Sequence, residues 1–157
     1  MKVELWQVGK TSFDYLKSGT DLYEKRIKNY LPFEVVTIPD IKNAKNLSVD
    51  LLKEKEGKEI LKKLQPGDFL ILLDEKGKSF GSVRFSAQLE KWLQLSNKRL
   101  VFLIGGAYGV SKDIFSRAQI KLSLSEMTFS HQMVRLFLIE QLYRALTIMR
   151  NEPYHHR

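Results

Sequence analysis

The chain has 157 residues, 43% of them hydrophobic and 28% charged, a composition typical of one globular domain and not of a disordered protein. Its 26 lysines and arginines exceed the 18 aspartates and glutamates, and the formal charge of +8 favours a polyanionic partner such as nucleic acid. Cysteine is absent, which excludes disulfides, thiolate zinc sites and a cysteine nucleophile. Because its apolar runs are shorter than a membrane span, we expect a soluble cytoplasmic protein that binds no membrane.

Short β-rich segments alternate with helical patterns along the whole chain. We expect strands at 2–8, 33–38, 69–74, 100–104 and 120–125, and helices at 12–30, 48–64, 82–97, 111–118 and 131–149. FLILLD at 69–74 and LVFLI at 100–104 are apolar throughout, as parallel strands covered on both faces are. This order predicts a single α/β domain, residues 1–157, in which a parallel sheet is flanked by helices.

Several residues mark where the predicted helices begin and end. Ser48, Ser82 and Ser111 stand at helix starts, where a hydroxyl can accept a hydrogen bond from a free backbone N–H. QPGD at 65–68 ends the second helix, and EKGK at 75–78 predicts a glycine turn after the third strand. The last helix is apolar on several sides, so it is either central to the fold or shared with another subunit.

The segment GGAYG, residues 105–109, follows a predicted strand and is a candidate binding loop. The dinucleotide-binding fingerprint would need glycines at 104, 106 and 109, but Ile104 occupies the first of these places. Glu126 lies near the position of a ribose-binding acid, although too few residues follow for the second half of such a fold.

Leu73, Gly105 and Leu124 all fall at predicted strand ends. Open parallel sheets bind ligands beyond these ends, so the sequence predicts a site where the three residues meet. From these residues, a dinucleotide-binding enzyme and a non-catalytic RNA-binding module stay as alternatives.

Three separated segments carry a family resemblance: FLIGGAYGVS at 102–111, LSLSEMTFSHQMVRLFLIEQLYRALTI at 122–148 and NEPYHHR at 151–157. Together with MKVELWQVGK and LLDEKGK, they resemble the bacterial 23S rRNA pseudouridine-N3 methyltransferases of the SPOUT superfamily over essentially the whole chain. The resemblance implies a C-terminal trefoil knot, a homodimer, S-adenosylmethionine as methyl donor, and 23S rRNA in the assembled ribosome as substrate. General topology rules disfavour knots, so the resemblance alone predicts this one.

The resemblance also implies which residues hold the methyl donor, largely through backbone groups. These are Leu73, Gly105, Leu124, Ser125, Glu126, Met127, Thr128 and Phe129. Glu126 then belongs to a loop that encloses the cofactor, which is a different explanation from a ribose contact.

Methylation at N3 of a pseudouridine removes the proton of an imide nitrogen, so the site needs a base or a group that stabilises the anion. Without cysteine, the covalent route to C5 of uridine is excluded. His131 and Arg135 share a face near the start of the last helix, and the tail adds Tyr154, two histidines and Arg157.

The candidate side chains also have purely structural interpretations. His155 and His156 fit a solvated terminus, and Arg135 and Arg144 fit a solvated or Glu140-paired helix face. The histidines lack a set of neighbouring ligands, so we expect no metal. The resemblance favours Tyr154 and His155 as contacts of the target nucleotide at a dimer interface. We expect Arg135 to contact RNA or stabilise the developing anion.

Overall fold

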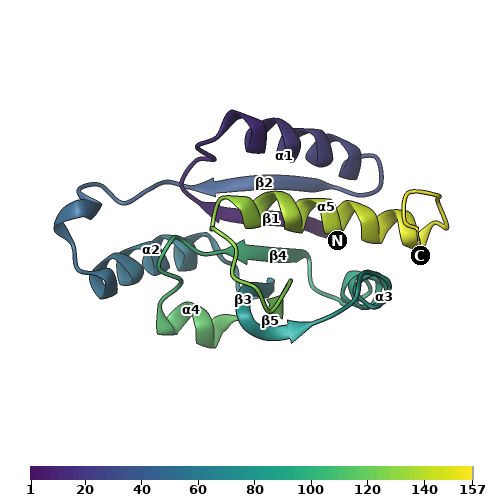
Figure 1. Ribbon diagram of the computed structural model, residues 1–157. Helices are drawn as coiled ribbons and strands as arrows, with labels where there is room; N and C mark the ends of the chain where they lie inside the picture. The colour runs from purple at the N-terminus through teal and green to yellow at the C-terminus, as the bar shows by residue number, and fades with distance from the viewer. Residues whose placement is uncertain (157) are drawn as a thin grey trace.

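The computed structural model describes residues 1–156, and its five strands form one parallel sheet between two layers of helices (Figure 1). The strands are β1 (Lys2–Val8), β2 (Phe33–Ile38), β3 (Phe69–Ser79), β4 (Arg99–Ile104) and β5 (Ile120–Ser123). They lie in the order β2-β1-β4-β3-β5, and every neighbouring pair is parallel. The predicted α/β architecture is confirmed.

Helices cover both faces of this sheet. They are α1 (Asp14–Ile27), α2 (Val49–Lys63), α3 (Ser82–Leu93), α4 (Lys112–Arg117) and α5 (Met133–Met149), with a short 3-10 helix, η1 (Ala44–Asn46). The buried side chains of α1, α3 and α5 pack on one face with Leu5 and Phe102. Ile60 of α2 and Ile114 of α4 pack on the other. The strands are apolar on both faces because both faces are covered.

Helix α5 lies over the sheet between α1 and α3 (Figure 1). Leu138, Ile139, Leu142 and Leu146 are buried in the same core as the strands. Of the two alternatives for this helix, a central place in the fold is the one that the structure shows. No helix within residues 1–156 has the length and apolar character needed to cross a membrane.

Two of the three predicted helix caps are confirmed. The Ser48 hydroxyl accepts a hydrogen bond from the Leu51 N–H at 3.2 Å, and the Ser111 hydroxyl accepts one from the Ile114 N–H at 3.4 Å. The prediction for Ser82 is wrong, because Gly81 is the N-cap and Ser82 is the first helical residue.

The glycine turn predicted at 75–78 is also wrong. Strand β3 continues through this segment to Ser79, with a shift of register against β5 between Leu73 and Lys78. A Cβ atom on Gly77 would lie 2.5 Å from the carbonyl carbon of Lys121. Glycine is therefore required here because two backbones approach closely, and not because the chain turns.

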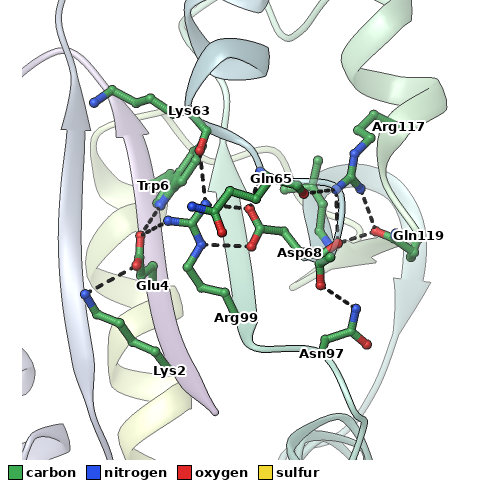
Figure 2. A network of polar contacts seen from close by, with 12 residues as sticks. Lys2, Glu4, Trp6, Lys63, Gln65, Asp68, Asn97, Arg99, Arg117 and Gln119 are labelled. Carbon is green, nitrogen blue, oxygen red and sulfur yellow. Dashed lines mark hydrogen bonds and ion pairs between the residues drawn. The ribbon is translucent and has the colours of Figure 1, made fainter.

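A network of polar side chains closes the amino edge of the sheet, where the strands begin (Figure 2). Asp68, 1% exposed, accepts hydrogen bonds from the Arg99 guanidinium and from the Gln65 N–H. Arg99 also donates to the Lys63 carbonyl at the end of α2, at 3.0 Å. Arg117 donates to the carbonyls of Gln65 and Asp68, so the turn before β3 is held from two sides.

Candidate functional site

A cavity of about 470 Å³, here called the edge cavity, lies beyond the carboxyl ends of β4 and β5 and beside the middle of β3, where Leu72–Glu75 line it. The prediction that Leu73 ends a strand is wrong, because β3 continues to Ser79. Its volume is in the range of small-molecule sites. Of the residues predicted to hold a methyl donor, those that line it are Leu73, Gly105, Leu124, Ser125, Met127, Thr128 and Phe129. Glu126 is exposed and is not part of this lining. The structure thus brings three distant segments to one edge of the sheet.

The glycine loop, residues 105–109, forms one wall of the edge cavity. A Cβ atom on Gly105 would lie 2.7 Å from Val110 Cγ1 and 3.2 Å from the Gly109 carbonyl oxygen. Gly109 has φ +89°, and its N–H donates to the Gly106 carbonyl at 3.1 Å. The loop is therefore a tight turn that brings bare backbone to the cavity.

The opposite wall is the β5–α5 loop, residues 124–132. The Ser123 hydroxyl donates to the Ser125 carbonyl at 2.8 Å, and the Ser125 hydroxyl accepts from the Met127 N–H at 3.0 Å. The Thr128 hydroxyl donates to Glu75 Oε2 at 2.6 Å, which joins this loop to β3. The serines thus shape the loop locally, and Thr128 fixes it across the cavity mouth.

His131 and Arg135 do not share a helix face as predicted, because α5 begins at Met133 and His131 lies in the turn before it. His131 lines the edge cavity, and burial, followed by the charge of Arg135, lowers its pKa. Arg135 is fully buried and donates to the Val8 carbonyl at 2.7 Å and to the Thr11 hydroxyl at 3.1 Å. The guanidinium thus attaches α5 to the end of β1, and it does not line the cavity.

The C-terminal tail folds back along α5. The Tyr154 hydroxyl donates to Glu140 Oε1 at 3.1 Å and lies 3.3 Å from the Tyr23 hydroxyl. The Tyr154 ring packs edge-on against Tyr143, with 4.7 Å between the ring centroids. Burial, followed by the hydrogen bond with Tyr23, raises the pKa of Tyr154, so its hydroxyl keeps its proton near neutral pH.

Arg144 connects the tail to Glu140. Its guanidinium donates to Glu140 Oε1 at 2.6 Å and 3.0 Å, which confirms the predicted Glu140 pairing of this arginine. The same guanidinium lies 3.0 Å from His155 Nδ1. His156 is exposed, and Arg157 lies outside the described residues.

Comparison with known proteins identifies the family. Residues 1–155 match the family model described as a predicted SPOUT methyltransferase. The chain belongs to the SPOUT methyltransferase family. This confirms the resemblance predicted from the sequence motifs, and it makes the protein an enzyme that transfers a methyl group. Of the alternatives kept above, methyl transfer is favoured over a dinucleotide enzyme and over a bare RNA-binding module.

Three relatives of this SPOUT methyltransferase carry the name "Ribosomal RNA large subunit methyltransferase H". The protein of that name from Parabacteroides distasonis is 57% identical over 156 residues, 99% of each chain. That from Flavobacterium johnsoniae is 57% identical over 157 residues, and that from Christiangramia forsetii is 51% identical over 157, each covering 100% of both chains. The similarity therefore extends over the full length of these proteins.

Sequence reasoning missed several side chains of this SPOUT methyltransferase site. Lys53 from α2 and Phe115 from α4 also line the edge cavity, and Glu56 Oε1 would lie 3.1 Å from a Cβ atom on Gly106. Burial, followed by the charge of Asp40, raises the pKa of Glu56. No motif marks Lys53 and Phe115, because they reach the edge cavity from α2 and α4, which cover the face of the sheet opposite α5. Glu56 lies beside Gly106 and is not part of the lining of the edge cavity. Within residues 1–156, no group of side chains suits a metal ion.

Proposed function

We propose that the protein transfers the methyl group of S-adenosylmethionine to N3 of a pseudouridine in 23S rRNA, in the assembled large ribosomal subunit. The observation that carries this proposal is the edge cavity, which has bare backbone and apolar side chains in its walls and belongs to a chain of a methyltransferase family. The names of relatives up to 57% identical support the ribosomal substrate, and the charge of +8 suits RNA. An enzyme that acts on ribosomes belongs in the cytoplasm.

The edge cavity fits S-adenosylmethionine in size and chemistry. Leu73, Leu124 and Phe129 offer apolar contacts for an adenine ring, and Gly105 lets backbone polar groups approach closely. Asp74 and Glu75 also line the cavity and suit a cationic ligand. When bound, S-adenosylmethionine would supply an electrophilic methyl group on a sulfonium.

The target nitrogen must lose its proton as it gains the methyl group, so negative charge develops on the pyrimidine ring. Arg144 can only donate hydrogen bonds, and His155 Nδ1 at 3.0 Å is therefore its acceptor. A neutral imidazole then carries its proton on Nε2. In this arrangement His155 donates to the anionic ring and does not take its proton, which passes to solvent.

A homodimer is also part of this proposal. Large hydrophobic side chains are exposed on the α1 region and on α5, by 39–63% of their surface. They are Phe13, Tyr15 and Leu22 of the α1 region and Phe137 of α5. Since α1 and α5 pack side by side, they offer one surface to a second copy. A partner could place its Tyr154 and His155 at the target nucleotide. Arg135 is fully buried and bonded to Val8 and Thr11, so its part in this proposal is to position α5 and not to contact RNA.

Two structural predictions belong to the same proposal. The C-terminal trefoil knot is supported by family membership and by the return of the β5–α5 loop across the sheet edge to α5 (Figure 1). A single SPOUT domain over residues 1–157 is supported by the family match, which covers residues 1–155.

Tritium transfer from labelled S-adenosylmethionine to large ribosomal subunits tests the function. We expect the full chain to label 23S rRNA and a chain truncated after Pro153 to lose the activity but keep its affinity for S-adenosylmethionine in calorimetry. NAD is the control ligand and should not bind. Unchanged turnover after truncation would remove the tail from the mechanism, and absent binding of S-adenosylmethionine would overturn the proposal.

A further inference from the structure

A second cavity of about 290 Å³, here called the helix cavity, adjoins the edge cavity. The two share Leu122, Ser123, Leu124 and Phe129 as lining residues. Its other walls come from the start of α3 and from α5, which pack against each other. The two cavities therefore border each other at the end of β5.

The polar groups of the helix cavity have a fixed orientation. The Ser82 hydroxyl donates to Gln141 Oε1 at 2.8 Å, and Gln141 Nε2 donates to Glu140 Oε2 at 3.1 Å. Because a carboxylate can only accept, the amide cannot be turned around. Gln141 Nε2 carries a second N–H, and the hydrogen bonds among residues 1–156 leave it free for a ligand.

Aromatic side chains form the apolar part of the helix cavity. Phe80, Phe129 and Phe137 line it, and the rings of Phe129 and Phe137 lie 4.8 Å apart between centroids. Flat rings of this kind stack against unpaired bases, which is how proteins commonly bind nucleotides taken out of an RNA structure. The combination of aromatic faces with one amide donor suits a pyrimidine with ring carbonyls.

Glu140 links the helix cavity to the C-terminal tail. This carboxylate lines the cavity and accepts hydrogen bonds from Arg144 and from the Tyr154 hydroxyl. The edge cavity, the helix cavity and the tail therefore follow one another along α5.

We propose that the helix cavity binds the extruded pyrimidine base that receives the methyl group, an inference that rests on the proposed function. Gln141 donates its free N–H to a ring carbonyl next to the reacting nitrogen. As that nitrogen loses its proton to solvent and gains the methyl carbon from the sulfonium, which leaves as a thioether, charge accumulates on the carbonyl oxygen. The hydrogen bond therefore strengthens during the reaction, so Gln141 affects turnover as well as binding.

Gln141→Met tests this inference, because methionine keeps the length of the side chain and removes the amide. We expect kcat/KM for large ribosomal subunits to fall about tenfold or more, which corresponds to the loss of one hydrogen bond to a charged acceptor. The affinity for S-adenosylmethionine should stay within about twofold, since the shared wall is unchanged. Ser82→Leu, which fills the helix cavity, should act in the same way. Gln94→Met, at the exposed end of α3, is the matched control.

Each outcome of this experiment decides something. Normal kcat/KM in both variants, beside an active wild-type protein, would overturn the inference and leave the proposed function intact. An equal loss of S-adenosylmethionine affinity would assign the helix cavity to the donor, and a shift to monomers in light scattering would assign it to a second copy of the chain. Either result overturns the inference. An inactive wild-type protein would overturn the proposed function and the inference with it.

Discussion

The amino and carboxyl ends of the parallel strands, here called the amino edge and the carboxyl edge of the sheet, carry different kinds of residues. At the amino edge, charged side chains are paired and bind backbone carbonyls, with Asp68 and Arg99 at the centre (Figure 2). At the carboxyl edge, glycines and short loops surround a cavity of about 470 Å³. The same parallel strands thus end in a closed polar network on one side and in an open pocket on the other.

This difference between the edges indicates that the amino edge contributes mainly to folding stability and the carboxyl edge mainly to ligand binding. Buried charges at the amino edge stabilise the fold only while both partners are present, since one unpaired charge is very unfavourable. The carboxyl edge depends on the absence of side chains, because a single Cβ atom changes where backbone can approach a ligand. Substitutions at the two edges should therefore affect different measurements.

The largest expected effect is at the amino edge. Asp68→Ala leaves the Arg99 guanidinium without its main partner, and we expect a loss of about 3–4 kcal/mol in the free energy of unfolding by urea. Affinity for S-adenosylmethionine at low urea should be unchanged. Asp21→Ala, on the exposed face of α1, is the control and should cost less than about 0.5 kcal/mol. A loss below about 1 kcal/mol at Asp68 would mean that the network contributes little.

Glycine substitutions compare the edges directly. Gly105→Ala places a Cβ atom 2.7 Å from Val110 Cγ1, so the glycine loop must shift. We expect S-adenosylmethionine to bind about 10- to 100-fold more weakly in calorimetry. At the amino edge, a Cβ atom on Gly67 meets nothing within 4 Å, and Gly67→Ala should bind normally. Equal affinities of the two variants would contradict the assignment of the edge cavity to the donor.

A third substitution tests the contribution of the C-terminal tail, independently of the two edges of the sheet. Glu140→Gln keeps the shape of the side chain but weakens its bonds with Arg144 and Tyr154, and we expect about 1–2 kcal/mol of lost stability in thermal unfolding. Methyl transfer should fall with S-adenosylmethionine affinity unchanged. Glu59→Gln removes a comparable but exposed pair with Lys62 and should cost less than about 0.5 kcal/mol. Matching losses in both variants would argue against a special role for Glu140.

The smallest expected effects are on how folding stability depends on pH. One glutamate at each edge should change that stability in opposite directions as the pH rises. At the amino edge, the Lys2 hydrogen bond lowers the pKa of Glu34, so its contribution to stability exists above the unfolded pKa and is lost as the pH falls. At the carboxyl edge, burial raises the pKa of Glu56, so ionised Glu56 destabilises the fold as the pH rises.

Melting temperatures at about pH 3.5 and about pH 7 test these signs. Relative to wild type, Glu34→Gln should lose stability only at the higher pH, and Glu56→Gln should gain stability only there. Shifts of the same sign in both variants would contradict this difference between the edges.

Much of the fold could be predicted from local sequence. The alternation of apolar segments and amphipathic helices placed all five strands, and Ser48 and Ser111 marked true helix starts. The failures were non-local. EKGK at 75–78 has the composition of a turn, yet it is strand, because Gly77 allows β5 to approach. Ser82 looks like a cap, but its hydroxyl bonds to Gln141, 59 residues away.

For the candidate site too, some features could be predicted from local sequence and others depended on tertiary contacts. The sequence by itself determined that the chain is α/β and that it carries the SPOUT motifs, and it predicted that Leu73, Gly105 and Leu124 meet, as they do in the edge cavity. It could do so because periodicity and short motifs are local properties. Only the tertiary structure decided that Arg135 is buried against Val8, that Glu140 holds Tyr154, and that Gln141 faces a second cavity. These are contacts between distant residues, and the partner of a polar side chain is set by packing, which no short stretch of sequence encodes.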